Sequence, residues 1–255
     1  MTYEEALSYI HGTIRKGAAP GLDRIRELME RLGNPHEQLS YVHITGTNGK
    51  GSTAAMTASV LRAAGYRVGL YTSPFLWRFN ERMNVDGRDI ADEELAQVTA
   101  LVKPAAQALS DPPTEFELVT AIALTWFARE HCDIVVLEVG MGGRNDATNV
   151  IPAPEAAVLC NIGLDHTAQL GSTLEAIAEN KSGILKPGCR GVLYPNTADV
   201  EAVVTGVCRE RGIPLQIADF SKIRVKCSDL TGQILDYKQY SDLHLPLLGA
   251  HQTRN

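Results

Sequence analysis

The feature that most constrains the fold is a glycine-rich turn that separates a short apolar run from an amphipathic stretch. The segment Thr45-Gly-Thr-Asn-Gly-Lys-Gly-Ser-Thr53 follows the apolar run 41–45 and leads into 52–64, where Met56, Val60 and Leu61 share one side of a helix. Glycines let several backbone N–H groups converge on one anion, and the N-terminus of a helix adds partial positive charge. This order predicts a buried strand, a phosphate-binding loop and a helix.

The loop departs from the common Gly-x₄-Gly-Lys-Ser/Thr pattern at two places. Ile44 stands where the first glycine would be, and Gly51 separates Lys50 from Ser52. A plain glycine turn before a helix is therefore the alternative interpretation. The lysine, which supplies a point charge for the outer phosphates, and the hydroxyl of Ser52, which can bind Mg²⁺, favour the phosphate-binding interpretation.

Strands and helices alternate along most of the chain. Apolar runs with the length of buried strands occupy 41–45, 67–71, 133–139 and 156–161. Helices are expected over 2–15, 21–32, 52–64, a run capped by Asp92, 116–130, 173–185 and 199–211. The alternation predicts an α/β fold with a doubly wound, mostly parallel sheet, and we expect one domain over 1–255.

The region from Lys222 to Leu247 has a different pattern. Polar and apolar residues alternate in 224–227 and 233–238, on either side of Thr231-Gly232. Alternation around a glycine turn is typical of antiparallel strands. We therefore expect a small antiparallel β ribbon appended to the main sheet.

The composition excludes several classes of protein. The 24 Lys and Arg residues are outnumbered by 30 Asp and Glu, which gives a net charge of −6 and argues against a nucleic-acid partner. No run approaches the roughly 20 apolar residues of a membrane helix, and no basic segment precedes an apolar one at the N-terminus, so we expect a cytoplasmic protein with no membrane partner. The five cysteines are widely spaced and form no Cys-x-x-Cys pair, so we expect reduced thiols, mostly buried, with no metal role.

Two further motifs place polar residues after predicted strands. Glu138 ends an apolar run, and Asp165 and His166 follow the run 156–161. Carboxyl ends of parallel strands line the ligand crevice, so we expect Glu138 on the same rim as the phosphate loop. A salt bridge is the alternative role for Glu138, a structural role is the alternative for His166, and a solvated surface charge is the alternative for Lys181.

Five ordered motifs together resemble folylpolyglutamate synthase and dihydrofolate synthase, a family within the Mur ligase superfamily. The motifs are Gly46-Thr-Asn-Gly-Lys-Gly-Ser52, Thr72-Ser-Pro74 with Glu81-Arg82, Glu138-Val-Gly140 with Gly142-Gly-Arg-x-Asp-Ala-Thr-Asn149, Gly163-Leu-Asp-His166, and Gly249-x-His-Gln-x-x-Asn255. The resemblance implies an ATP-dependent amide ligase, in which ATP phosphorylates a folyl or dihydropteroyl carboxylate and the amine of L-glutamate displaces the phosphate. Phosphoryl transfer depends mainly on charge neutralisation and alignment, which agrees with these residues.

The resemblance also implies roles for individual residues. Lys50 and the loop amides would hold the triphosphate, Ser52 and Glu138 would serve a first Mg²⁺, and His166 and Lys181 would serve a second, with Lys181 carbamylated as in relatives. Asn255 matches a residue near the adenine. The expected nucleotide-binding residues are Gly46, Thr47, Asn48, Gly49, Lys50, Gly51, Ser52 and Asn255, and the expected catalytic residues are Lys50, His166 and Lys181.

On the acceptor side, the segment 72–83 matches a mobile loop near the folate. The expected substrate residues are Thr72, Ser73, Pro74, Arg82, Phe116, Glu117 and Asp146. Phe75 replaces a histidine that is common in the family, and Asn145 replaces a leucine, and both changes affect the pterin side. Asn180 and Ser182 flank Lys181 where Glu and Ala are usual.

Relatives continue into a C-terminal domain that closes over the nucleotide. We therefore expect this chain, which ends at Asn255, to be a monomeric fragment that binds nucleotide but does not ligate efficiently. A cell-wall Mur ligase is disfavoured because only 45 residues precede Gly46, too few for a nucleotide-sugar domain. A phosphate-loop kinase or NTPase with another substrate, in which Glu138 binds the metal, is the remaining alternative.

Overall fold

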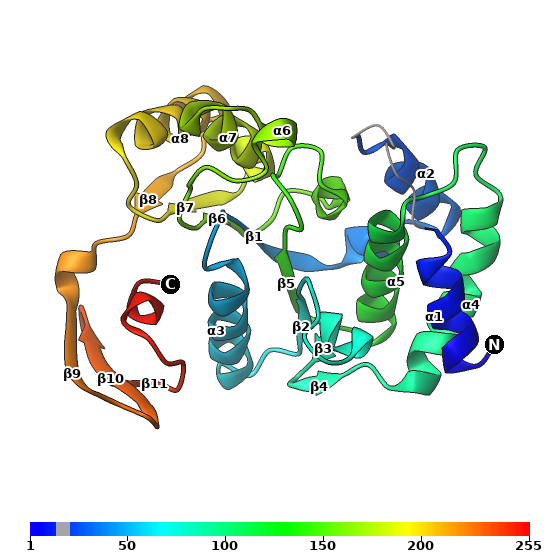
Figure 1. Cartoon of the computed structure of the whole chain (residues 1–255), viewed down its shortest axis with the longest axis horizontal. Helices are drawn as coiled ribbons and strands as arrows, with labels where there is room; N and C mark the ends of the chain where they lie inside the picture. The colour runs from blue at the N-terminus through cyan, green and yellow to red at the C-terminus, as the bar shows by residue number, and fades with distance from the viewer. Residues whose placement is uncertain (14–20) are drawn as a thin grey trace.

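An eight-stranded, mostly parallel sheet forms the centre of the computed structural model, which describes residues 1–13 and 21–255 (Figure 1). The strand order is β4-β3-β2-β5-β1-β6-β7-β8, and β3 and β4 join antiparallel at one edge. The strands are β1 (Ser40–Thr45), β2 (Val68–Tyr71), β3 (Met83–Val85), β4 (Arg88–Asp89), β5 (Ile134–Glu138), β6 (Ala156–Leu159), β7 (Arg190–Leu193) and β8 (Leu215–Ile217). The predicted α/β class with a mostly parallel sheet is confirmed.

Helices cover both faces of this sheet, as a doubly wound fold requires. Helix α3 packs on one face against Val42, Ile44 and Val136, while α5 packs on the opposite face against Tyr41 and other β1, β2 and β5 residues. The helices are α1 (Tyr3–His11), α2 (Asp23–Arg31), α3 (Lys50–Ala63), α4 (Asp92–Gln107), α5 (Glu115–Arg129), α6 (Thr167–Leu170), α7 (Leu174–Lys181) and α8 (Ala198–Arg211). Short 3₁₀ helices are η1 (Pro35–Gln38), η2 (Phe79–Arg82), η3 (Ala147–Val150), η4 (Ser182–Ile184), η5 (Phe220–Lys222) and η6 (Ala250–Arg254).

Strand β1 lies between β5 and β6, and this arrangement positions the site. Ile44 is paired in register with Glu138 of β5, and Thr45 is paired with Leu159 of β6. The carboxyl ends of the three strands therefore meet at one edge of the sheet. Loops that leave this edge are the usual ligand-binding segments of open α/β sheets.

The C-terminal region forms the expected small antiparallel ribbon, but as a three-stranded sheet of its own that is not appended to the main sheet. Its strands are β9 (Ile223–Asp229), β10 (Gly232–Tyr237) and β11 (Tyr240–Leu245), in the order β11-β10-β9. It stands beside α3, at the opposite side of the molecule from α1 (Figure 1). The third strand escaped prediction because five of its six residues are exposed and its apolar positions are few.

Several expected helices have different limits or faces. The first helix ends at His11, and residues 14 and 15 of the expected range lie outside the described residues. Val60 of α3 is 69% exposed, because the buried side of that helix consists of small residues and not of the predicted apolar stripe. Asp92 is the first residue of α4 and Ala91 is its N-cap. The expected helix 173–185 is shorter, since α7 ends at Lys181 and η4 follows.

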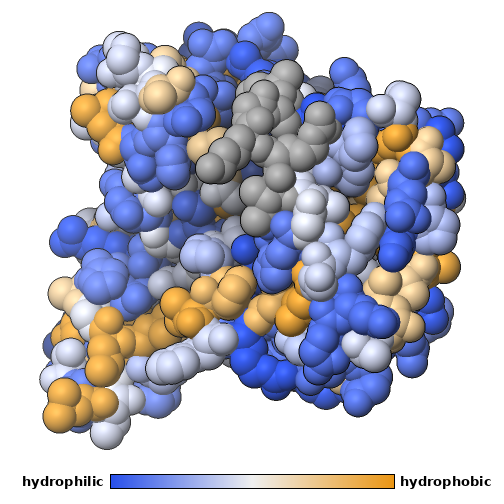
Figure 2. Space-filling model, turned by 45° about the vertical axis from the view of Figure 1, so that its right-hand side comes forward, coloured by the Kyte–Doolittle hydropathy of each residue, from blue (hydrophilic) through white to orange (hydrophobic). Residues whose placement is uncertain are grey.

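The surface drawn in Figure 2 is mostly hydrophilic, with hydrophobic side chains gathered in a band along its lower part. Four of the five cysteines are buried and Cys227 is exposed, and all five are free thiols, as expected. Among the described residues, no helix is both long enough and apolar enough to cross a membrane.

Candidate active site

The phosphate loop is anchored to the strand beside it. Gly49, with a φ of 83°, ends the loop and caps α3. Thr47 donates its N–H to the Asn161 carbonyl at 2.7 Å and its hydroxyl to the Gly163 carbonyl at 3.0 Å. The loop between β1 and α3 is therefore held against the end of β6 before any ligand binds.

Two lysines converge on one carbonyl of this loop. Lys50 donates to the Gly46 oxygen at 3.1 Å, and Lys181 donates to the same oxygen at 2.8 Å. The Lys181 side chain is buried, with 3% of its surface exposed, so the alternative of a solvated surface lysine is wrong. Burial, and after it the nearby positive charge of Lys50, lower the pKa of Lys181 to about 8. Two neighbouring cations that share one carbonyl are suited to an anionic ligand.

Glu138 lies at the end of β5 and faces the first turn of α3. It is 4% exposed, and its Oε2 accepts the Ser73 N–H at 3.1 Å. A Cβ atom at Gly51 would lie 3.6 Å from the same oxygen, so the first turn of α3 is in van der Waals reach of the carboxylate. Burial raises the pKa of Glu138, and the described residues give it no ion pair within 4.0 Å, so the alternative salt-bridge role is not seen.

A buried carboxylate without an ion pair, close to a half-buried serine, has the chemistry of a magnesium site. Mg²⁺ prefers oxygen ligands from one or two carboxylates and from phosphates. Glu138 and Ser52 are therefore the residues that would hold such an ion.

The second group of expected metal ligands is less complete. His166 is exposed, with φ of 47°, and its Nε2 lies 3.6 Å from Asp165 Oδ2. Lys181 points to the Gly46 carbonyl and offers an ammonium group. Within the described chain, no three His, Cys, Asp or Glu side chains gather closely enough to hold a metal ion.

A cavity of about 480 Å³ opens on the other side of Glu138. Six of the seven expected substrate residues line it, namely Ser73, Pro74, Arg82, Phe116, Glu117 and Asp146. Thr72 does not line it and instead approaches the Glu81 carbonyl at 3.4 Å. Ser73 connects the two parts of the site, because it lines the cavity and also donates its N–H to Glu138.

The loop over this cavity is organised by two side chains. The Glu81 carboxylate accepts the N–H groups of Leu76, Trp77 and Arg78 at 2.8–3.1 Å. Arg82 lies 5.5 Å from the ring centres of both Phe75 and Phe79, and its buried Nε has no hydrogen-bond partner among the described residues. Cation–π contacts thus hold the guanidinium at the cavity wall with donor capacity left for a ligand.

Asn255 also reaches the phosphate loop. Its carbonyl accepts the Thr53 hydroxyl at 3.1 Å, and its Oδ1 lies 2.5 Å from the position of a Cβ at Gly49. The final described residue is therefore packed against the loop that precedes α3.

Comparison with known proteins gives the family. The Mur ligase middle domain matches residues 44–255. The chain belongs to the Mur ligase family. It is 39% identical over 263 residues to dihydrofolate synthase/folylpolyglutamate synthase of Bacillus subtilis and 41% identical over 267 residues to folylpolyglutamate synthase of Lacticaseibacillus casei. These alignments cover 99% and 100% of this chain but 61% and 62% of the two relatives.

Solved structures give the same result for the fold of this chain. An FPGS–AMPPCP–folate complex superimposes with a TM-score of 0.92 at 40% identity, covering 100% of this chain and 64% of that one. Folylpolyglutamate synthase from Thermotoga maritima superimposes with a TM-score of 0.89 at 36% identity, covering 99% and 59%.

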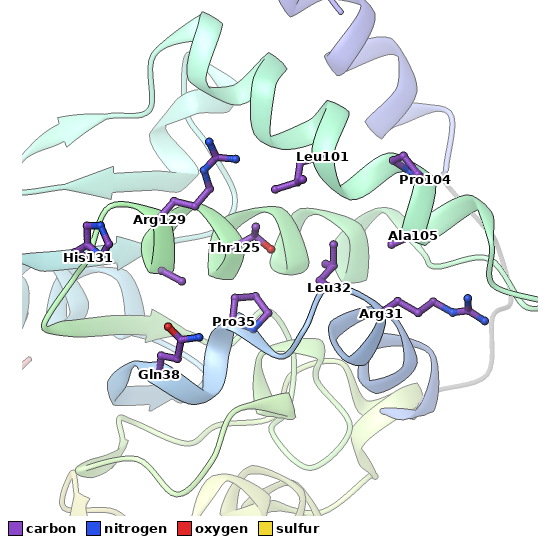
Figure 3. A pocket seen from close by; sticks show the side chains of 11 residues that line it. Arg31, Leu32, Pro35, Gln38, Leu101, Pro104, Ala105, Thr125, Arg129 and His131 are labelled. Atoms are coloured by element: carbon purple, nitrogen blue, oxygen red, sulfur yellow. The ribbon is translucent and has the colours of Figure 1, made fainter.

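A larger hollow of about 770 Å³ lies between α2, α4 and α5 (Figure 3). None of the expected site residues lines it; its walls are Arg31, Leu32, Pro35, Gln38, Leu101, Pro104, Ala105, Thr125, Ala128, Arg129 and His131. Its lining shares no residue with the phosphate loop or with the 480 Å³ cavity.

Sequence reasoning missed several residues of the 480 Å³ cavity. Arg24 was expected only as part of a helix, yet its Nε donates to Glu117 Oε2 at 3.0 Å and it lines the cavity. The other unassigned lining residues are Gly21, Thr114, Gly140, Met141 and Ala147. Asn145 had been singled out by its departure from the family, and that was the available signal; Arg24 gave none.

Proposed function

We propose that this chain is the ATP-binding part of an ATP-dependent ligase that joins L-glutamate to the carboxyl group of dihydropteroate or a reduced folate. The observation that carries the proposal is the meeting of Lys50, Lys181 and Glu138 at the carboxyl ends of adjacent strands, with the 480 Å³ cavity joined to them through Ser73. The names of the relatives and the FPGS–AMPPCP–folate structure support the choice of substrates.

In the proposed reaction, an oxygen of the acceptor carboxylate attacks the γ-phosphorus of ATP and ADP leaves. The glutamate amine then attacks the acyl carbon, phosphate leaves, and the amine loses a proton. Lys50 and the loop N–H groups hold the phosphates and neutralise their charge, while Arg82 orients the acceptor in the cavity. This division leaves no covalent step for a protein side chain.

Mg²⁺ supplies further charge neutralisation of the phosphates when bound, and Ser52 and Glu138 are the residues that would hold it. A second Mg²⁺, with His166 and carbamylated Lys181 as ligands, is also part of the proposal. The Lys181 ammonium first loses a proton. The neutral amine then adds to CO₂ and releases a second proton, which leaves a carbamate anion. The lowered pKa of Lys181 supports this step, because more of its amine is neutral near pH 7 than in an ordinary lysine.

The test is ADP release by the protein in the presence of L-glutamate and either dihydropteroate or tetrahydrofolate. Release with both acceptors assigns a bifunctional synthase, and release with one assigns the substrate. ADP release with an alcohol acceptor and no dependence on glutamate would favour a kinase and refute the proposal.

A further inference from the structure

Side chains on one face of β1 form hydrogen bonds at two points with the glycine-rich segment that follows β5. Thr45 and His43 are two residues apart and therefore project from the same face of the strand. Thr45 donates its hydroxyl to the Gly142 carbonyl at 2.5 Å, and His43 Nε2 lies 2.9 Å from Thr148 Oγ1. The strand that carries the phosphate loop is thus bonded to both ends of the loop that lines the acceptor cavity.

The second contact continues to the cavity wall. Thr148 donates its hydroxyl to Asp146 Oδ1 at 2.5 Å and its N–H to the same oxygen at 3.0 Å. Asp146 Oδ2 accepts the N–H of Met141 at 2.9 Å, and both of these residues line the cavity. His43 and Thr148 are fully buried and Asp146 is 7% exposed, so water does not compete for these bonds.

Counting protons gives the direction of this chain of bonds. The single hydroxyl proton of Thr148 is donated to Asp146, so the bond between His43 and Thr148 needs its proton from the histidine. His43 is therefore the Nε2–H tautomer. Its Nδ1 is buried without a partner among the described residues, as expected for a nitrogen that carries no proton. Burial lowers the pKa of His43 to about 3, which keeps the ring neutral.

We propose that His43 is a positioning residue for the acceptor, which acts through Thr148 to hold Asp146 and the 140–149 segment in the shape that binds the pteroyl group. The inference rests on the function proposed above. His43 itself lines no cavity and touches no reacting atom, and its effect is transmitted by the two hydrogen bonds. We expect replacement of His43 to change nucleotide affinity only weakly, because Thr47 holds the phosphate loop through its hydrogen bonds to Asn161 and Gly163.

The experiment compares three variants of the full 255-residue chain. His43→Leu removes the donor at similar volume, His43→Gln restores an N–H donor near the position of Nε2, and Thr148→Val removes the hydroxyl that joins the two ends. Affinity for dihydropteroate and, separately, for AMPPCP with Mg²⁺ is measured by calorimetry. Thermal unfolding of each variant is recorded as a check on folding.

The expected result is dihydropteroate binding about tenfold weaker in His43→Leu and Thr148→Val, recovery in His43→Gln, and AMPPCP affinity within about twofold throughout. The double variant His43→Leu/Thr148→Val is expected to be no weaker than either single variant, because both break one path. The ¹⁵N shifts of the His43 ring are expected to show a proton on Nε2.

Two results would overturn the inference in different ways. Wild-type binding of dihydropteroate that neither His43→Leu nor Thr148→Val weakens refutes the positioning role and leaves the proposed function standing. Absence of binding of both dihydropteroate and tetrahydrofolate by the wild-type chain refutes the proposed substrates, and the positioning role is refuted with them. Equal losses of acceptor and nucleotide affinity in His43→Leu and His43→Gln would show general damage to β1 and not positioning.

Discussion

Replacing Lys181 by methionine is predicted to stabilise the chain near neutral pH while destroying the site. The buried ammonium is held with its pKa lowered from 10.5 to about 8, chiefly by loss of hydration. At about 1.4 kcal/mol per pKa unit, this shift corresponds to a penalty of roughly 3 kcal/mol for the protonated amine in the folded chain. Loss of the hydrogen bond from Lys181 to the Gly46 carbonyl costs the variant about 1 kcal/mol of this gain. The cost is no larger because Lys50 still donates to that carbonyl.

The net expectation for Lys181→Met is therefore a gain of about 2 kcal/mol at pH 7, or roughly 4–8 °C in Tm for a chain of this size. The sign follows from proton uptake. The folded pKa lies below the unfolded one, so the penalty is fully present below pH 8 and disappears as pH rises from about 8 towards 10.5, where the unfolded chain binds more protons. The advantage of the variant should shrink across that window and reverse near its upper end.

The assay is chemical denaturation of wild type and variant at several pH values between 7 and 10.5. Lys222→Met, at an exposed lysine, is the matched control and should show no such dependence. A variant that is less stable than wild type at pH 7, or a stability difference that does not change above pH 8, would refute the description of Lys181 as a buried, strained cation.

Other substitutions separate the parts of the site. Gly49→Ala puts a side chain at a φ of 83° and 2.5 Å from Asn255 Oδ1, so we expect a loss of about 1–2 kcal/mol in denaturation, whereas Gly206→Ala, in open space on α8, should be neutral or stabilising. Glu138→Gln removes a carboxylate whose pKa is raised by burial, so the apo chain should keep or gain stability, while calorimetry should show at least tenfold weaker binding of AMPPCP with Mg²⁺. Arg82→Leu should weaken dihydropteroate binding about tenfold or more and leave AMPPCP binding unchanged, and a parallel loss of both would contradict its place in the acceptor cavity.

Local features of this fold could be predicted because their causes lie within short segments. The phosphate loop follows from glycines, a lysine and a helix start within nine residues, and β1 and β5 follow from continuous apolar runs. Strands β7 and β8 were missed because neither forms a continuous apolar run: β7 begins with Arg190 and Gly191, and β8 has Gln216 between its two apolar residues. The prediction that Val60 belongs to the buried side of α3 was wrong, because the positions that face the sheet, Thr53 and Ala54, are small and weakly apolar.

The site was harder to predict where it depends on contacts between distant segments. The acceptor cavity combines residues from α2, the 73–82 loop, α5 and the segment after β5, and Arg24 reaches it through an ion pair with Glu117, 93 positions away. His43 sits in a buried strand with no local sign of its bond to Thr148, 105 positions later. Lys181 could not be distinguished from a surface lysine until α7 was placed over the phosphate loop.

The central claim is that the phosphate loop and the 480 Å³ cavity are two adjacent parts of one site. The most direct test is a calorimetric titration of dihydropteroate into the chain with and without saturating AMPPCP and Mg²⁺. The account predicts that both ligands bind at the same time, one of each per chain, and that Glu138→Gln and Arg82→Leu weaken different ligands. Competition between the two ligands, or acceptor binding that is insensitive to Arg82→Leu, would contradict it.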